Sequence, residues 1–209
     1  MEKGKLLVIS GFSGVGKGTV VNYLKEHSDK YKISVSVTTR EPRENEIPGV
    51  HYHYITNEEF EKMIHEGRLL EHAGYVDHYY GTPKDFVEEN LEKGNDVILE
   101  IETKGALQVK ANKPDAILIF ILPPSAEELK NRLVGRQTET EEVIQERLKK
   151  AAEETENIEK YDYYVLNDEV DKCAMHIENI KNDKNTKSLD MDFVNQIKSE
   201  VLMFAEGDQ

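Results

Sequence analysis

The most constraining feature of the sequence is a glycine-rich stretch from Gly11 to Lys17, GFSGVGK, which fits the spacing G-x-x-x-x-G-K. A short apolar run precedes it and helical sequence follows it, which is the context that the motif requires. The glycines let the backbone curl so that successive N–H groups converge on phosphate oxygens, while the start of the helix and Lys17 add positive charge. The stretch therefore predicts a phosphate-binding loop. The alternative is a glycine-rich turn that happens to contain a lysine.

The loop is expected to contact phosphate along its whole length. Its residues are Gly11, Phe12, Ser13, Gly14, Val15, Gly16, Lys17, Gly18 and Thr19. Gly18 stands where a Ser or Thr usually ligates magnesium, and Thr19 is assigned to a phosphate oxygen through its N–H and hydroxyl. Because Mg²⁺ keeps several waters and can be held largely by substrate phosphates, we expect no direct protein ligand for it.

Short apolar runs recur along the chain, each followed by helical sequence. They lack period-2 alternation, as expected of strands that are covered on both faces of a parallel sheet. The predicted strands are residues 5–9, 96–101, 116–122 and 161–166, and the predicted helices are residues 17–27, 105–111, 126–136 and 171–181. This pattern predicts an α/β fold, a P-loop three-layer sandwich around a central parallel sheet, and a length of 209 residues suits a single domain.

Two segments interrupt the alternation. Residues 34–86 are predicted to form an inserted small mixed α/β subdomain, because alternating runs surround one helical stretch. The runs lie at 34–38, 50–55 and 69–75, and the helix lies at 58–66. Residues 137–159 begin with capping-box spacing and continue as a charged helix, which fits an exposed helical lid. The core then comprises residues 1–33, 87–136 and 160–209.

A terminal amphipathic helix is predicted from apolar positions at spacings of four. These positions are Leu189, Phe193, Ile197 and Val201. The apolar face could pack on the core or on a second subunit, so that monomer and homodimer both remain open.

The charge balance limits the classes of partner. The 41 acidic side chains and 27 Lys and Arg side chains give a formal net charge of −14. Proteins that bind DNA, RNA or anionic membranes normally carry a basic face, so polymeric nucleic acid and membrane surfaces are not expected partners. The apolar runs fall far short of the ~18 residues that span a bilayer. A single cysteine, Cys173, and no visible secretion signal lead us to expect a cytoplasmic location.

Four stretches outside the loop carry a resemblance to a known family. They are SVTTREPR (36–43), EHAGYVDHYYGTP (71–83), ILEIETKGA (98–106) and PPSAEELKNRLVGRQTETEE (123–142). With the loop, they make the chain resemble the bacterial guanylate kinases, which are nucleoside monophosphate kinases, over roughly residues 5–180. The resemblance implies ATP and GMP as substrates and Mg²⁺ as the companion of ATP. It further implies direct in-line transfer of the γ-phosphoryl of ATP to GMP, which gives ADP and GDP, in purine nucleotide metabolism and GMP recycling.

The resemblance also implies which residues bind GMP. The phosphate is assigned to Arg40, Arg43, Tyr52 and Tyr80, and guanine is assigned to Ser36, Glu71, Thr82 and Glu100. Guanine offers N1–H and N2–H₂ side by side, so a carboxylate can accept from both while a hydroxyl donates to O6. Adenine has an acceptor at N1, and the lost pairing should cost ~1–3 kcal/mol or more. The alternatives are that Glu71 is a solvated charge, and that Arg40 and Arg43 pair with Glu41, Glu44 or Glu46.

Catalysis is assigned by the same resemblance to basic residues. They are Lys17, Arg40, Arg132, Arg136 and Arg147, of which the last three would close over the triphosphate. Phosphoryl transfer needs in-line positioning and positive charge more than covalent help. The alternative is that the arginines of the arm pair on helix faces with Glu128, Glu139 or Glu146.

Three polar residues have two interpretations each. The resemblance implies that Asn167 lies near the adenine of ATP, and the alternative is an ordinary Asx turn. Glu100 and Glu102 are expected on one side of a strand end, where either could order the magnesium water shell. For Glu102, the alternative is to cap the helix that opens at Thr103.

Two other functions remain open. One is a guanylate-kinase-like scaffold module that binds phosphopeptides, although such modules typically have degraded phosphate loops and this loop is intact. The other is the same reaction on AMP or UMP.

Overall fold

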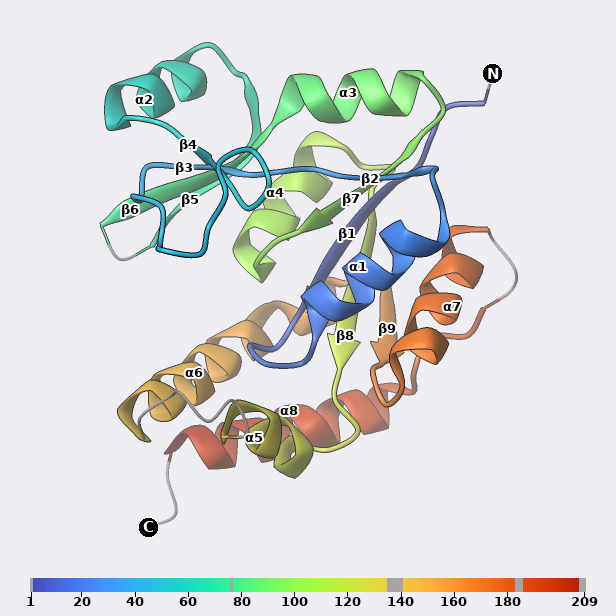
Figure 1. Cartoon of the computed structure of the whole chain (residues 1–209). Helices are drawn as coiled ribbons and strands as arrows, with labels where there is room; N and C mark the ends of the chain where they lie inside the picture. The colour runs from blue at the N-terminus through green and yellow to red at the C-terminus, as the bar shows by residue number, and fades with distance from the viewer. Residues whose placement is uncertain (1, 76, 135–140, 183–185, 207–209) are drawn as a thin grey trace.

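A parallel sheet forms the centre of the molecule. The computed structural model describes residues 2–75, 77–134, 141–182 and 186–206, and Figure 1 shows their arrangement. Five parallel strands run in the order β2-β7-β1-β8-β9. They are β1 (Leu6–Gly11), β2 (Tyr31–Ile33), β7 (Asp96–Glu100), β8 (Ile117–Leu122) and β9 (Tyr163–Leu166). Every residue of β1 is buried, which explains why its sequence does not alternate. The parallel sheet predicted from the apolar runs is confirmed.

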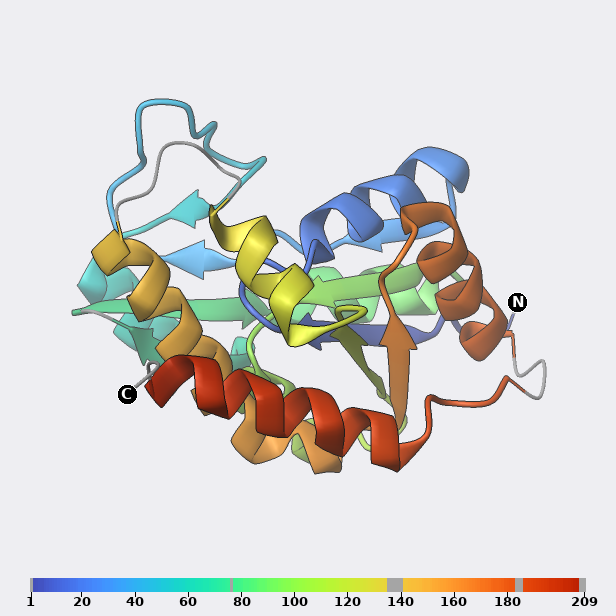
Figure 2. The ribbon, with the colours of Figure 1, turned by 90° about the horizontal axis from the view of Figure 1, so that it is seen from below.

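Helices cover both faces of this sheet. The chain moves one way along the sheet from β1 to β2 and the other way from β7 to β8, so right-handed crossovers put the connecting helices on opposite faces. These helices are α1 (Lys17–His27), which packs beside α7 (Val170–Lys181), and α4 (Thr103–Asn112), which packs against η1 (Thr155–Lys160). Figure 2 shows α1 and α7 above the sheet and α8 (Met191–Glu206) below it. The predicted three-layer arrangement is confirmed.

A second, smaller sheet lies beside the first, at the upper left of Figure 1. It is mixed, in the order β4-β3-β6-β5. Its strands are β3 (Val37–Thr38), β4 (His53–Tyr54), β5 (Leu69–Tyr75) and β6 (His78–Pro83), with α2 (Asn57–His65) packed on them. A capping box between Thr56 and Glu59 begins α2, and the buried Phe60 anchors it. The predicted mixed subdomain is therefore present, although β3 and β4 are shorter than the runs that suggested them.

The helices around the predicted lid lie at the lower end of the molecule in Figure 1. They are α5 (Ala126–Val134) and α6 (Glu141–Glu154), and both contact α8. Residues 137–140 of the predicted lid lie outside the described residues. The side chains of Val194, Ile197 and Val201 are buried in the core cluster, so this face of α8 packs on its own chain.

The connection from the small sheet back to the large one is helical. α3 (Lys84–Glu92) packs against β7 and was not among the predicted helices. Within the described parts of the chain, we find no helix with the length and apolar character needed to span a membrane.

Candidate active site

The glycine-rich stretch forms a tight loop between β1 and α1. Gly14 and Gly16 have φ angles of 85° and 95°, which residues with side chains rarely adopt. Gly16 is the N-cap of α1, and no described side chain caps its first turn. The first N–H groups of the helix therefore remain available to an anion, as the motif predicts.

Lys17 is folded back over the loop. Its Nζ donates to the carbonyl oxygen of Gly11, and to that of Phe12 over 3.2 Å. An ammonium group held by loop carbonyls is already close to the space that the loop encloses. Lys17 is thus placed to exchange these carbonyls for phosphate oxygens when a ligand enters.

Two side chains from other elements hold the loop from outside. The carbonyl oxygen of Val15 accepts from Asn167 Nδ2 over 2.7 Å and from Arg132 Nη1 over 3.3 Å. Arg132 also donates to the carbonyl of Asn167 over 3.1 Å, and its Nε pairs with Glu128 at 2.8 Å. Arg132 therefore makes the helix-face pair considered from the sequence and contacts the loop as well. The side chain of Asn167 is buried against the loop backbone, which neither interpretation from the sequence described.

Glu100 lies beside Gly18. A β-carbon added at Gly18 would be 3.6 Å from Glu100 Oε1, so the carboxylate occupies the region that a Ser or Thr hydroxyl would approach. Burial raises the pKa of Glu100 and Lys17 lowers it. No group of three or more acidic, His or Cys side chains among the described residues could hold a metal by itself. A single carboxylate suits Mg²⁺ that keeps most of its waters.

Glu102 does not share the strand end with Glu100. β7 ends at Glu100, one residue earlier than the predicted strand 96–101, and Glu102 is the N-cap residue of α4. The Glu102 side chain makes no capping hydrogen bond and pairs instead with Lys150 of α6.

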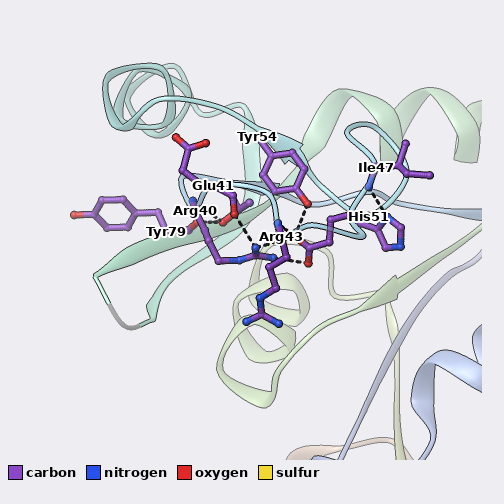
Figure 3. A network of polar contacts seen from close by, with 9 residues as sticks. Arg40, Glu41, Arg43, Ile47, His51, Tyr54 and Tyr79 are labelled. Atoms are coloured by element: carbon purple, nitrogen blue, oxygen red, sulfur yellow. Dashed lines mark hydrogen bonds and ion pairs between the residues drawn. The ribbon is translucent and has the colours of Figure 1, made fainter. Parts of the chain in front are cut away.

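A second group of basic and tyrosine side chains lies at the edge of the small sheet. Arg40 forms a bidentate pair with Glu46, with both N–O distances 2.8 Å. Glu46 Oε2 also accepts from the Tyr54 hydroxyl and the Arg43 backbone N–H, each over 2.8 Å (Figure 3). The hydrogen bonds from Arg40 and from the Arg43 backbone hold the pKa of Glu46 well below its usual range. Pairing of Arg40 with a nearby acid, one of the alternatives from the sequence, is thus observed.

The tyrosines expected at this place are close to Arg40. Its Cζ lies 5.3 Å from the ring centroid of Tyr52, and the rings of Tyr52 and Tyr80 are 5.9 Å apart. Arg43 is exposed, and Figure 3 shows its side chain without a dashed line to its guanidinium. The structure therefore brings Arg40, Tyr52 and Tyr80 together and leaves the Arg43 guanidinium in solvent.

A buried carboxylate lies between the small sheet and α4. Glu71 is only 6% exposed and accepts from the Thr82 hydroxyl over 2.7 Å. Burial raises the pKa of Glu71, and the Thr82 hydrogen bond opposes this. Glu71 is not the solvated charge that was the alternative. Ser36 is half-buried in the segment that leads into β3.

Gly105 makes room for this carboxylate. A β-carbon added at Gly105 would lie 2.6 Å from Glu71 Oε2 and 3.1 Å from Cδ. The first turn of α4 therefore approaches Glu71 more closely than any residue with a side chain would allow.

The structure describes only some of the arginines predicted around the lid. Arg147 is half-buried on α6. Arg136 lies outside the described residues, as does Glu139. Sequence reasoning missed a further acid, Glu154, which contacts the loop from the end of α6. Its spacing of three from the buried Ala151 was a signal that it falls on the inner side of this helix.

A phosphate-binding loop on a parallel α/β core, with a basic site on an inserted sheet, defines a P-loop nucleotide-binding protein. The model of the family described as Guanylate kinase matches residues 3–184. The guanylate kinase of Oceanobacillus iheyensis is 51% identical over 186 residues, which are 89% of this chain and 90% of the relative. That of Bacillus anthracis is 53% identical over 180 residues, covering 86% and 88%.

The fold comparison agrees. The crystal structure of guanylate kinase from Anaplasma phagocytophilum superposes with a TM-score of 0.70 at 35% identity, covering 89% of this chain and 88% of that one. The chain belongs to the guanylate kinase family.

Proposed function

We infer that the protein is an ATP:GMP phosphotransferase that transfers the γ-phosphoryl of ATP to GMP and releases ADP and GDP. Phosphorylation of GMP by ATP is the reaction of the family. The observation in the structure that carries the inference is the buried Glu71–Thr82 pair, in a chain whose phosphate-binding loop is intact. A carboxylate is rarely buried without a cation or several hydrogen-bond donors, and the edge of a base that carries two donors would supply them to Glu71.

Guanine recognition follows from the chemistry of that pair. Ionised Glu71 accepts from guanine N1–H and N2–H₂, and guanine O6 needs a donor. The proton of the Thr82 hydroxyl is already donated to Glu71, so the Ser36 hydroxyl is the candidate donor to O6. Adenine would set its N1 lone pair against the carboxylate, and the loss of buried pairing costs ~1–3 kcal/mol. Selectivity against AMP thus comes from the polar groups that the wrong base leaves unpaired.

The GMP phosphate is bound at the Arg40 group. Glu46 takes one edge of the Arg40 guanidinium, which has five N–H donors, and fixes its orientation. The hydroxyls of Tyr52 and Tyr80 and the solvent-facing Arg43 complete a set of donors for the phosphate. Forked guanidinium groups suit phosphate because they bind two of its oxygens at once.

Phosphoryl transfer depends on positioning and positive charge. The loop N–H groups and Lys17 hold the phosphates of ATP, while Arg132, Arg136 and Arg147 add charge around the transferring group. Transfer is direct and in line, without a covalent enzyme intermediate. ATP brings Mg²⁺, which neutralises phosphate charge, and Glu100 would bind one of its waters.

The setting of the reaction follows from its substrates. ATP and GMP are metabolites of the cell interior, which supports a cytoplasmic role in purine nucleotide metabolism and GMP recycling. Packing of α8 on its own core supports a monomer, and a homodimer would need a different surface.

A direct assay tests the function. Purified protein with ATP, Mg²⁺ and GMP should form ADP and GDP in equal amounts, measured by anion-exchange chromatography. dGMP, AMP and UMP are tested as competing acceptors in the same assay. The inference fails if no GDP forms, or if AMP or UMP is phosphorylated at the same rate as GMP.

A further inference from the structure

A carboxylate of the lid helix binds the phosphate-binding loop. Glu154 is the last residue of α6 and is only 6% exposed. Its Oε2 accepts the backbone N–H of Ser13 over 3.0 Å. The loop is built to bind anions, so an acidic side chain of the same protein at its backbone needs an explanation.

Charged and titratable groups face Glu154 from every side. Lys17 of α1 and Lys150 of α6 attract its charge, and Glu102 at the start of α4 repels it. Tyr161, which follows η1, is a further titratable neighbour. Lys150 pairs with Glu102. Lys17 is therefore the principal cation that favours the ionised form of Glu154.

Binding of a triphosphate changes these surroundings in one direction. Lys17, now held by the carbonyls of Gly11 and Phe12, would turn to the phosphates, which neutralise its charge. The phosphates also bring negative charge close to Ser13. Both changes disfavour a carboxylate at Glu154.

We propose that Glu154 is a positioning residue for the phosphate-binding loop and that it takes up one proton from solvent when ATP binds. In the free enzyme its carboxylate holds the Ser13 N–H and balances Lys17. In the complex the neutral carboxyl keeps the same N–H through its carbonyl oxygen and no longer repels the phosphates. This proposal rests on ATP being the ligand of the loop.

The affinity for ATP should depend on pH. Burial raises the pKa of Glu154 to about 7, with Lys17 and the Ser13 N–H opposing the rise, and bound ATP raises it further. ATP therefore binds most tightly below pH ~7, and affinity falls as pH rises between the pKa of the free enzyme and that of the complex. The fall reaches at most about tenfold per pH unit, because one proton is exchanged.

Calorimetry of ATP binding to the full-length enzyme with Mg²⁺ at pH 7.5 tests the proposal. Titrations in buffers of different ionisation enthalpy give the number of protons taken up. We expect a substantial fraction of one proton for the wild type and for Glu153→Gln, a matched control at an exposed neighbouring position. For Glu154→Gln, which can still accept the Ser13 N–H, we expect loss of this uptake and a flat affinity between pH 7 and 8.5. Glu154→Ala removes the acceptor of the Ser13 N–H and should also raise KM for ATP. Glu154→Gln keeps an acceptor, so its KM for ATP should lie much closer to that of the wild type.

The possible results distinguish the role of Glu154 from the proposed function. Equal proton uptake by Glu154→Gln and the wild type, or none by the wild type, would overturn the role of Glu154. Absence of proton uptake by the wild type would overturn this role even if the variants do not fold. Failure of ATP to bind at all would instead contradict the proposed function.

Discussion

The hydroxyl of Thr82 donates to Glu71 over 2.7 Å and holds a carboxylate that is almost fully buried between β5, β6 and α4. The hydrogen bond engages Oε1 of Glu71, and the other oxygen, Oε2, lies against Gly105 in the first turn of α4. The two residues lie on the neighbouring strands β5 and β6, whose pairing holds both ends of the hydrogen bond. Preorganised polar groups of this kind discriminate strongly, since a wrong ligand leaves them unsatisfied.

Replacing Glu71 tests the recognition of guanine. Glu71→Gln keeps the size of the side chain but turns one acceptor into a donor that faces the donors of guanine. We expect kcat/KM for GMP to fall about 10- to 100-fold, consistent with ~1–3 kcal/mol for a lost buried pairing. KM for ATP should stay unchanged, and the exposed Glu61→Gln serves as the control. An equal loss for both substrates would contradict a role in base recognition.

The same carboxyl group should give the reaction an acid limb. Burial raises the pKa of Glu71 above its usual range, and only the ionised form accepts both guanine donors. Binding of GMP to the free enzyme should therefore weaken as pH falls through this raised pKa. Profiles of kcat/KM for GMP against pH measure the effect, and the limb should be absent in Glu71→Gln. A limb that persists in this variant would belong to another group.

Gly105→Ala should damage GMP use without unfolding the protein. In a helix this change normally stabilises by roughly 0.5–1 kcal/mol, but here the new methyl would lie 2.6 Å from Glu71 Oε2 and push the carboxylate away. We expect at least about a tenfold loss in kcat/KM for GMP, corresponding to ~1.4 kcal/mol. Thermal unfolding and ATP affinity, measured together with kinetics, separate the displaced acid from a loss of fold. Unchanged GMP kinetics would show that Glu71 can move at no cost.

Glu46→Ala tests whether Glu46 orients Arg40 or competes with phosphate for it. The substitution removes the acceptor of Arg40, Tyr54 and the Arg43 backbone together. We therefore expect KM for GMP to rise about 10- to 100-fold, consistent with ~1.5–3 kcal/mol for lost hydrogen bonds to charged groups. Glu44→Ala, an exposed acid in the same loop, is the control. A lower KM for GMP would mean instead that Glu46 occupies the phosphate site.

Lys17→Met should abolish turnover and leave the fold intact. Lys17 bonds to two loop carbonyls that solvent can also satisfy, whereas its charge is needed on the transferring phosphates. We expect kcat to drop by more than about 10²-fold, as for loss of other groups that stabilise transition-state charge. Lys25→Met, at the exposed end of the same helix, should retain activity. Substantial turnover by Lys17→Met would exclude Lys17 from the catalytic groups.

Features encoded in contiguous residues were predictable from the sequence. The loop from Gly11 to Gly16 follows from spacing and context, and β7 at Asp96–Glu100 follows from an unbroken apolar run. In the small subdomain the strand that begins at Leu69 has the predicted bounds, whereas the one at His53–Tyr54 is short. There the chain turns at Gly49, whose φ is 78°, and the backbone N–H groups of Val50 and His51 donate to the Ile47 carbonyl instead of to a neighbouring strand.

Contacts between distant parts of the chain were not predictable. Glu154 and Ser13 are 141 positions apart, and Lys150 and Glu102 are 48 apart. Both pairs depend on where α6 comes to lie after packing on α8, and no local pattern encodes that position. The role of Gly105 was hidden for the same reason, because a glycine in a helical stretch shows its purpose only when its neighbour across the interface is known.

The central position of β1 in the sheet determines how ATP binding is lost when the protein unfolds. β1 is flanked by β7 and β8, every one of its residues is buried, and it leads directly into the phosphate-binding loop. Such a strand exchanges its amide hydrogens only when the whole domain opens, whereas edge strands and helix ends open locally. The ATP site should therefore persist through partial unfolding at the edges, and loss of ATP binding during heating should coincide with global denaturation.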